Sequence, residues 1–264
     1  MEQKNIEVRE LASQYNINLK NTGIPEDSIT LDYLKNYINE NFFPHVLEKK
    51  PINGIRKMIS DHLVSGLKEA ALISLYEDIN CDNLIKAKEE NNSIPYNVFM
   101  MKIIASAINE FSYMNSSIKN NEIITYKEIN IGLAVDSNIG LIVPVIRNVN
   151  LKSINDLANE YGELIKRAKK GIIKEIDISG GTFTVSNLGS TGISYFMSIP
   201  NWPQTSILST GKIEQRPLVI NGKIEIHNMM TASVTVDHRA IDGAPAARFL
   251  SGLKEKFENF NGIE

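Results

Sequence analysis

Residues 229–250 carry the pattern that most restricts how this chain can fold. The apolar run from Met229 to Val236 predicts a buried strand, and residues 244–250 read as the start of a helix. Between them, the residues Asp-His-Arg-Ala-Ile-Asp-Gly at 237–243 place a histidine at a strand-to-helix corner, with a carboxylate four residues later. An imidazole at such a corner is well placed to act as a general base.

The spacing alone leaves a purely structural interpretation equally open. Asp242 could cap the helix, with Pro245 in its first turn. His238 could then be an ordinary polar residue at the end of a strand. Both interpretations predict the same strand, corner and helix, and they differ only in the chemistry of the corner.

The motif also resembles that of a known family. His-x-x-x-Asp-Gly is similar to the active-site signature of the chloramphenicol acetyltransferase-like superfamily. Its fuller form, Asp-His-Arg-x-x-Asp-Gly-Ala, resembles the dihydrolipoamide acyltransferase components of 2-oxo acid dehydrogenase complexes. Further blocks resemble that family's core in the family's order, at residues 129–135, 140–147, 180–189 and 211–214. The resemblance covers roughly Pro51 to the C-terminus. It implies an α/β (α+β) fold of the chloramphenicol acetyltransferase-like type, a mixed-sheet sandwich with flanking helices.

The resemblance also implies an activity and a set of site residues. The expected reaction moves an acyl group, here expected to be acetyl, between dihydrolipoamide and coenzyme A within a 2-oxo acid or acetoin dehydrogenase complex. His238 would act as the base, and Ser186 would donate a hydrogen bond to the tetrahedral intermediate. Asp242 would hold the His238 loop by pairing with an arginine, for which Arg56 is the candidate, and Gly243 would support the same corner. The resemblance further implies a homotrimer, or a multiple of trimers, in which His238 and Ser186 come from different chains.

Residues 182–186 form the second candidate segment. Thr-Phe-Thr-Val-Ser alternates strictly, so Phe183 and Val185 should face one side of a strand and the three hydroxyls the other. By composition the hydroxyl face would be exposed to solvent, whereas the resemblance favours a polar channel. We do not expect Ser186 to be a nucleophile, because it lacks a nucleophile-elbow signature and the acyl acceptor supplies its own thiol.

The chain divides into a small module at 1–40, a connector at 41–50 and the acyltransferase domain at 51–264. The module has two apolar helical stripes, a turn-rich connection and Ser28 or Thr30 as a plausible cap. It resembles a degenerate peripheral subunit-binding domain, although a helical arm that packs on the chain's own core is an equal alternative.

Other elements of the main domain follow from periodicity and turn signals. Helices are expected at 55–68 and 98–111, and the clearest at 151–170, with Ser153 and Asp156 resembling a capping box and Gly171 as the stop. Strands are expected at 131–135 and 141–146, and a hairpin at 217–226 with Asn221-Gly222 as its turn.

Composition excludes several other functions. The net charge of −3 and the pI of about 5.9 indicate that the chain has no nucleic-acid partner. The absence of a long apolar run in the sequence indicates that it has no membrane partner. Cys81 is the single cysteine and is expected to be inert, which suits a reducing, cytoplasmic location. The four histidines show no metal-ligand spacing. We therefore expect no metal.

Coenzyme A and lipoate are the expected substrate groups. The family's Asp-Lys-Ala lipoylation signal is absent from this sequence, so lipoate should be supplied by another chain or by a removed domain. The partners would then be a lipoyl-bearing protein and the other subunits of the dehydrogenase complex. Two alternatives are a non-catalytic scaffold of such a complex and a stand-alone coenzyme A-dependent acetyltransferase. Retention of His238, Ser186 and Asp242 argues against the scaffold, and the Arg239-containing motif argues against the stand-alone enzyme.

Overall fold

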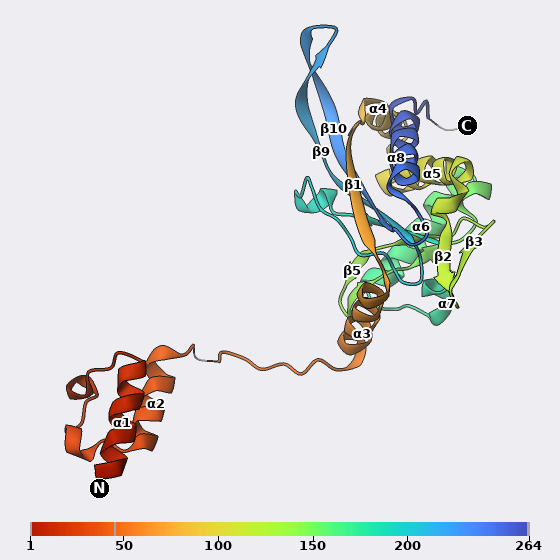
Figure 1. Cartoon of the computed structure of the whole chain (residues 1–264). Coiled ribbons are helices and arrows are strands. Elements are labelled where there is room, and N and C mark those ends of the chain that lie inside the picture. The colour runs from red at the N-terminus through yellow and green to blue at the C-terminus, as the bar shows by residue number, and fades with distance from the viewer. Residues whose placement is uncertain (1, 45, 263–264) are drawn as a thin grey trace. The chain divides into compact units, whose positions relative to one another are not determined.

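The computed structural model describes residues 2–44 and 46–262 of the chain (Figure 1). Contacts within the chain define two compact units, Met1–Ile52 and Asn53–Glu264. His45, one of the four histidines, lies outside the described residues. Each unit is described by itself below.

The smaller unit is a pair of helices with a small core of its own. It contains α1 (Glu2–Gln14), the 3-10 turns η1 (Leu19–Asn21) and η2 (Glu26–Ser28), and α2 (Leu31–Phe42). Buried apolar side chains from both helices and from Ile29 form its core, and these are Val8, Ala12, Ile29, Leu34 and Ile38. Thr30, rather than Ser28, caps α2, because its hydroxyl accepts the Tyr33 N–H at 3.1 Å.

The larger unit is built on a six-stranded mixed sheet in the order β1-β10-β9-β8-β4-β7. Its strands are β1 (Leu72–Asn80), β4 (Ile131–Leu133), β7 (Val145–Ile146), β8 (Phe183–Asn187), β9 (Ser206–Ile220) and β10 (Lys223–Asp237). The β8 strand runs parallel to both β4 and β9, and the other pairs are antiparallel. Two small hairpins accompany the sheet, β2 (Ser116–Lys119) with β3 (Glu122–Thr125) and β5 (Val135–Ser137) with β6 (Gly140–Ile142).

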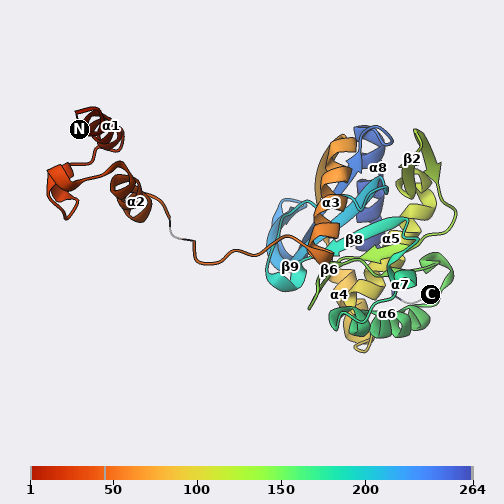
Figure 2. The same ribbon diagram turned by 90° about the horizontal axis from the view of Figure 1, so that it is seen from below.

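Helices pack on one face of this sheet and bury its apolar side (Figures 1 and 2). They include α4 (Asp82–Glu90), α5 (Tyr96–Glu110) and α8 (Gly243–Glu258), which contact one another, and α6 (Ile154–Lys169), which packs on α5. The remaining helices are α3 (Gly54–Glu69), α7 (Glu175–Ile178) and the 3-10 turns η3 (Ser112–Met114), η4 (Val149–Leu151) and η5 (Gly189–Thr191). On β10, Met230, Ala232, Val234 and Val236 point into this core and are fully buried.

Most of the predicted elements are present, with corrections to one helix, two strands and one hairpin. The helix predicted from residue 151 begins at Ile154, and Leu151 lies in η4 with a 79% exposed side chain. Ser153 caps α6 by accepting the Asp156 N–H, and Gly171 follows its end with a φ of +70°. Each of the strands predicted at 131–135 and 141–146 is divided into two short strands. In the second, Pro144 interrupts the pairing because it has no N–H to donate.

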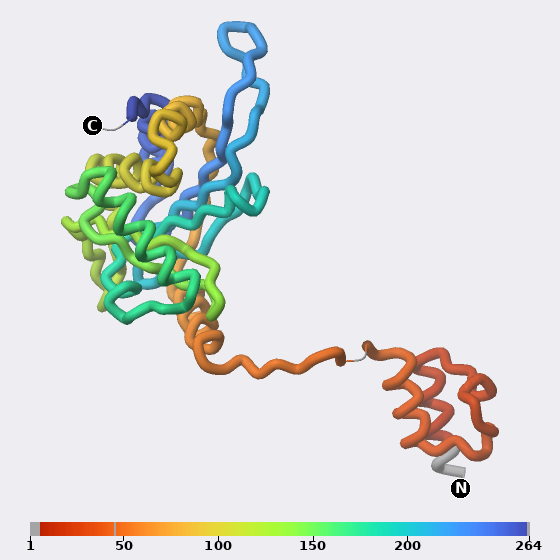
Figure 3. The backbone as a smooth tube through the Cα atoms, turned by 180° about the vertical axis from the view of Figure 1, so that it is seen from behind, coloured from red at the N-terminus to blue at the C-terminus, as the bar shows by residue number. Residues whose placement is uncertain are grey.

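The hairpin of β9 and β10 is much longer than the predicted segment at 217–226. Its turn is the predicted Asn221-Gly222, with both residues at positive φ. The last pair between β1 and β10 is Asn80 with Met229, and the last pair between β8 and β9 is Asn187 with Thr210. Among the described residues no other strand pairs with the rest of the hairpin, so residues 214–228 project as a two-stranded ribbon (Figure 3). Throughout residues 2–44 and 46–262, no helix has both the length and the apolar character needed to cross a membrane.

Candidate functional site

The predicted strand-to-helix corner is present and its backbone is fixed by hydrogen bonds. The Asp237 N–H donates to the Thr205 carbonyl at 2.8 Å, and the His238 N–H donates to the Ala71 carbonyl at 2.7 Å. The Asp237 carbonyl accepts the N–H groups of Ala240 and Ile241 at 2.9 and 3.0 Å, which closes the turn before α8. The position of His238 is therefore set by the start of β1 and the loop before β9.

The Asp237 side chain forms a buried clamp beneath this corner. Its carboxylate is 2% exposed and accepts hydrogen bonds from the Ala71 N–H, the Arg239 N–H and the Arg239 guanidinium, at 2.7–3.2 Å. The guanidinium also lies over the Trp202 ring, 5.6 Å from its centroid. Burial alone would raise the pKa of Asp237, but the hydrogen bonds from Arg239 and Ala71 hold this pKa below its ordinary value.

The sequence interpretation did not find this clamp. It assigned the arginine partner to Asp242, whereas the arginine inside the motif pairs with Asp237. The two residues stand on either side of His238, and this Asp-x-Arg spacing was the available signal.

Asp242 lies near His238 but does not fix it by a hydrogen bond. The His238 Nδ1 and Asp242 Oδ1 atoms are 3.7 Å apart, beyond hydrogen-bond distance, and the two side chains are 45% and 79% exposed. Asp242 occupies the N-cap position of α8, yet its side chain makes no capping hydrogen bond. Asp242 is therefore at the capping position that the structural interpretation predicts, but the capping hydrogen bond is not formed.

The two supporting residues predicted for this corner, Arg56 and Gly243, do not have the expected role among the described residues of one chain. Arg56 is exposed on α3, and no ion pair joins it to Asp242 in the part of the chain that the structure describes. The predicted Arg56–Asp242 pair is therefore absent from the single chain. Gly243 is the first residue of α8, and an added Cβ there would lie 3.8 Å from the Ile73 Cδ1 atom, an ordinary contact. None of the residues that the structure describes therefore requires a glycine at that position.

Ser186 differs from the other hydroxyls of its strand. Thr184 is buried and donates to the Gln204 Oε1 atom at 2.6 Å, and Thr182 is buried and bonded to the backbone of Asn130. Those two hydroxyls are therefore buried and hydrogen-bonded within the chain, and Thr182 borders a polar cavity of about 460 Å³. Ser186 is half-buried, and among the described residues its hydroxyl has no hydrogen-bond partner. It is the hydroxyl of this row that remains available to a ligand.

Sheet register places Ser186 far from His238 of the same chain. Ser186 lies opposite Ser209 on β9, and Ser209 lies opposite Ser233 on β10. His238 follows five residues after Ser233, past the end of β10. With strands about 4.8 Å apart and a rise of about 3.3 Å per residue, the two residues are separated by roughly 15–20 Å. They cannot both touch one thioester within a single chain.

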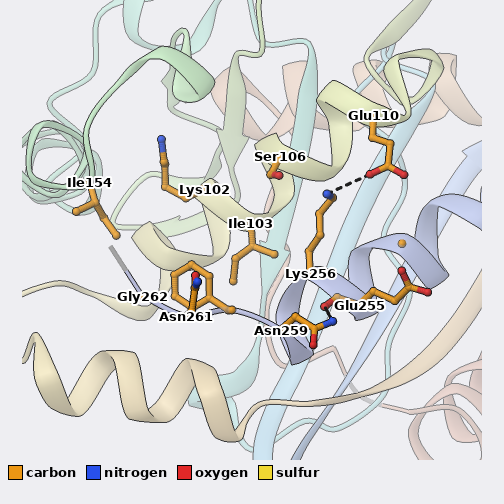
Figure 4. A pocket seen from close by; sticks show the side chains of 12 residues that line it. Lys102, Ile103, Ser106, Glu110, Ile154, Glu255, Lys256, Asn259, Asn261 and Gly262 are labelled. Carbon is orange, nitrogen blue, oxygen red and sulfur yellow. Dashed lines mark hydrogen bonds and ion pairs between the residues drawn. The ribbon is translucent and has the colours of Figure 1, made fainter. Parts of the chain in front are cut away.

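Two of the cavities on the larger unit illustrate how its other surfaces are lined. One of about 460 Å³ has a polar lining that includes His62, Tyr126, Trp202 and Gln204, and it shares Trp202 with the Arg239 clamp. Another, of about 440 Å³, lies between α5 and α8. In Figure 4, Lys256 from α8 points across it to Glu110, and that ion pair measures 3.1 Å. Neither lining includes His238 or Ser186.

Two other reactive side chains, Cys81 and His227, are buried or held by neighbouring residues. Burial raises the pKa of the Cys81 thiol to about 12, so the thiol stays protonated. His227 contacts Asp82 at the base of the β9–β10 hairpin, with 2.7 Å between Nδ1 and Oδ2. Within residues 2–44 and 46–262, no three His, Cys, Asp or Glu side chains form a group that could hold a metal ion.

Comparison with known proteins places this corner in a described family. The profile of the 2-oxoacid dehydrogenases acyltransferase (catalytic domain) family matches residues 45–263. The lipoamide acyltransferase component of the branched-chain alpha-keto acid dehydrogenase complex of Bacillus subtilis (strain 168) is 34% identical over 221 residues, which cover 80% of this chain and 52% of that protein. The succinyltransferase component of the 2-oxoglutarate dehydrogenase complex of Pseudomonas aeruginosa is 32% identical, over 81% of this chain and 55% of that protein. The chain thus spans about half the length of these curated relatives.

Solved structures agree with this placement. The Azotobacter vinelandii dihydrolipoamide acetyltransferase superposes with a TM-score of 0.77 at 30% identity, over 84% of this chain and 95% of that one. A chloramphenicol acetyltransferase superposes with a TM-score of 0.50 at 16% identity, over 81% and 98%, and this likeness concerns the fold alone. The predicted fold class is thereby confirmed. The chain belongs to the family of 2-oxoacid dehydrogenase acyltransferases and contains their catalytic domain.

Proposed function

We propose that this chain transfers an acetyl group between dihydrolipoamide and coenzyme A within a 2-oxo acid dehydrogenase complex. The observation that carries the proposal is the His238 corner, whose backbone and Asp237–Arg239 clamp hold an exposed imidazole at the end of β10. A scaffold subunit has no need of such a clamp beneath an exposed histidine.

The spacing of His238, Ser186 and Asp242 along the sequence supports their assignment to the active site. In the Azotobacter vinelandii enzyme, a serine, a histidine and an asparagine were investigated for their roles in the catalytic mechanism. That serine and histidine are 52 residues apart and the asparagine follows four residues later, which is the spacing of Ser186, His238 and Asp242. The third position differs, since this chain has a carboxylate where that enzyme has an amide.

The chemistry requires a base for a thiol and a donor for an oxyanion. A thiol with a pKa of about 8.5 is only a few per cent thiolate at neutral pH, so His238 takes the proton of the coenzyme A thiol as its sulfur attacks the thioester carbonyl. The carbonyl oxygen becomes an oxyanion and accepts a hydrogen bond from the Ser186 hydroxyl. Collapse of the intermediate expels the dihydrolipoamide sulfur, which receives the proton from His238. One thioester replaces another, so the step is reversible and redox-neutral.

The proposal requires more than one copy of the chain. Ser186 and His238 of one chain lie roughly 15–20 Å apart by sheet register, whereas a base and an oxyanion donor must each lie within about 3 Å of the reacting groups. We therefore propose that each site combines His238 of one copy with Ser186 of another, in a homotrimer or a multiple of trimers. Arg56 remains a candidate partner of Asp242 only across such an interface.

We also propose that lipoate reaches this site on another chain or on another part of a longer protein. The smaller helical unit would dock the companion subunits of the complex, as the resemblance of residues 1–40 implies. The single cysteine, which is buried, is consistent with a cytoplasmic location.

A thioester-exchange assay with dihydrolipoamide tests the activity and the acyl group together. Acetyl-, succinyl- and isobutyryl-coenzyme A are offered to the purified chain, and acetyl is expected to be transferred fastest. His238→Ala should lower turnover by about 10²–10⁴-fold, and Ser186→Ala by about 10²–10³-fold with little change in KM. His62→Ala, at another exposed histidine, is the matched control and should remain active. Normal turnover of His238→Ala would exclude the proposed base, and absence of any exchange by the unaltered chain would favour a scaffold.

A further inference from the structure

Trp202 is the single tryptophan of the chain and lies beside the His238 corner. It belongs to the turn before β9, in which the Gln204 N–H donates to the Asn201 carbonyl at 3.0 Å. The Arg239 guanidinium lies over the Trp202 ring, 5.6 Å from the ring centroid. A segment that is remote from the motif in the sequence therefore contacts it directly.

The Arg239 guanidinium is thus held on two sides. Along its edge, Nε donates to both Asp237 carboxylate oxygens at 3.0 and 3.1 Å, and Nη2 donates to Oδ2 at 2.7 Å. Across its face lies the Trp202 ring, which attracts a cation. The Arg239 side chain is 37% exposed, and hydrogen bonds along one edge do not fix the tilt of its plane. The ring restricts that tilt, because it covers one face of the guanidinium.

The α3 helix fixes the ring in turn. Gly66 is buried where α3 passes Trp202, and a Cβ added at Gly66 would lie 3.1 Å from the Trp202 Cβ atom. The absence of a side chain at this position allows the close approach. Five residues later, the Ala71 N–H donates to the Asp237 carboxylate and the Ala71 carbonyl accepts the His238 N–H. One short segment thus supports both the ring and the histidine.

Trp202 also has a neighbour on its other side, which defines an alternative role. It borders the polar cavity of about 460 Å³, together with His62 and Tyr126. A ring that bound substrate in that cavity would act on substrate affinity, whereas a ring that supports Arg239 acts on turnover. The contact with Arg239 is the one that the structure shows.

We propose that Trp202 is a positioning residue for His238. Its ring holds the Arg239 guanidinium in the plane that pairs with Asp237. The Asp237 carboxylate then fixes the Ala71 segment, whose carbonyl binds the His238 backbone. A displacement of about 1 Å can cost about 10² in rate, so this support acts on turnover. The inference rests on the proposed function, in which His238 is the base, and it adds a residue from outside the motif to the site.

The first test separates the aromatic face from the mere presence of an apolar side chain at residue 202. Trp202→Leu removes the ring, and Trp202→Phe keeps an aromatic face for Arg239. In the thioester-exchange assay, Trp202→Leu should lower kcat by about three- to tenfold and change KM by less than about twofold, because the hydrogen bonds of Arg239 to Asp237 remain. Trp202→Phe should recover most of the lost turnover. Circular dichroism and urea unfolding check that each assayed protein is folded.

Tyr195→Leu is the matched control. Tyr195 also lies in the segment before β9 and contacts another arginine, with the Arg216 guanidinium 5.3 Å from its ring centroid. Neither residue belongs to the clamp beneath His238, so Tyr195→Leu should keep the kcat of the unaltered chain. An equal loss in Tyr195→Leu and Trp202→Leu, or no recovery in Trp202→Phe, would contradict the proposal.

A second test determines whether Trp202 acts through Arg239. Arg239→Lys keeps the positive charge beside Asp237 but loses the planar guanidinium. If the ring acts through that group, Trp202→Leu should lower kcat much less in the Arg239→Lys background than in the unaltered chain. Losses that simply multiply would mean that the two residues act independently, and the proposal would be wrong.

The fluorescence of Trp202 gives a measurement that needs no catalysis. Because Trp202 is the single tryptophan, quenching of its emission by acrylamide reports on this ring alone. Arg239→Lys uncovers one face of the ring, so quenching should increase. Unchanged quenching would show that the guanidinium does not cover the ring and would rule out the proposed support. This measurement also stands if Trp202→Leu folds poorly.

The outcomes separate this inference from the proposed function. If His238→Ala abolishes exchange while Trp202→Leu keeps full kcat, the positioning role is wrong and the enzyme assignment stands. A raised KM with unchanged kcat in Trp202→Leu would also overturn the positioning role and place the ring against the substrate. Normal turnover of His238→Ala would reject the proposed base, and the role of Trp202 with it.

Discussion

At the scale of single residues, the His238 corner is a histidine supported by its neighbours in the sequence. Asp237 is buried beneath it and Arg239 closes the clamp, while Asp242 stays exposed. The motif could be found in the sequence because its residues are adjacent. Its internal pairing was missed, because Arg56 was considered as the partner of Asp242 and the Asp-x-Arg spacing of Asp237 and Arg239 was not used.

The clamp gives a prediction about positioning. Asp237→Asn removes the charge that Arg239 and the Ala71 N–H bind, so the free energy of unfolding should fall by about 1–2 kcal/mol, a modest value because the Arg239 side chain is 37% exposed. Turnover should fall by about tenfold or more, because His238 loses its fixed position. Urea unfolding and the exchange assay measure the two effects. Asp136→Asn, at an exposed carboxylate of β5, should change neither. Full turnover of Asp237→Asn would mean that the clamp is purely structural.

At the scale of elements, local signals predicted the helices and the hairpin turn well. Ser153 caps α6, and Asn221-Gly222 forms the turn, because both depend on residues close together in the chain. The strands at 131–135 and 141–146 were predicted less well, since each changes partner midway and only the tertiary arrangement decides where. The length of the β9–β10 hairpin was also missed, because the polar and apolar residues of 206–216 follow no simple alternation.

The base of the hairpin should be sensitive to pH through His227. The hydrogen bond that the His227 ring donates to the Asp82 carboxylate is the main cause that raises the pKa of His227 above 6.5, and Glu225 adds to it, with its Oε2 atom 3.6 Å from Nε2. Arg216 lies directly across the ribbon from His227 and opposes its positive charge. Because the folded-state pKa is raised, the stabilisation is fully present below about pH 6.5 and is lost as pH rises through that higher pKa.

Urea unfolding of the unaltered chain and of His227→Gln at pH 5.5 and 8.5 measures this effect. The stability difference between the two proteins should be larger at pH 5.5. An equal difference at both values of pH would show that His227 contributes only through packing. The titration of the other histidines is common to both proteins and cancels in the comparison.

At the scale of the whole molecule, the sequence predicted the family and its fold but could not show how the copies meet. The separation of Ser186 from His238 depends on the order β8-β9-β10 and on the register of each strand pair. Neither the order nor the register can be predicted from short stretches of sequence. The role of the small helical unit could not be predicted from the sequence either, because it depends on the partner proteins that the unit binds.

Deleting residues 1–40 tests that role. The deletion should abolish co-migration with the companion dehydrogenase subunits in size-exclusion chromatography, yet spare exchange with free dihydrolipoamide. Leu34→Asp, which places a charge in the module's own core, should have the same effect. Co-migration that survives both changes would place the docking surface elsewhere.

The central claim is that each site combines His238 of one copy with Ser186 of another, and mixing two inactive variants tests it most directly. His238→Ala and Ser186→Ala chains are unfolded together in equal amounts, refolded and assayed for thioester exchange. If each site takes one residue from each of two neighbours, random assembly into rings leaves about a quarter of the sites with both residues intact, so about a quarter of the unaltered activity should return. Activity no greater than that of the two variants refolded separately would contradict the account.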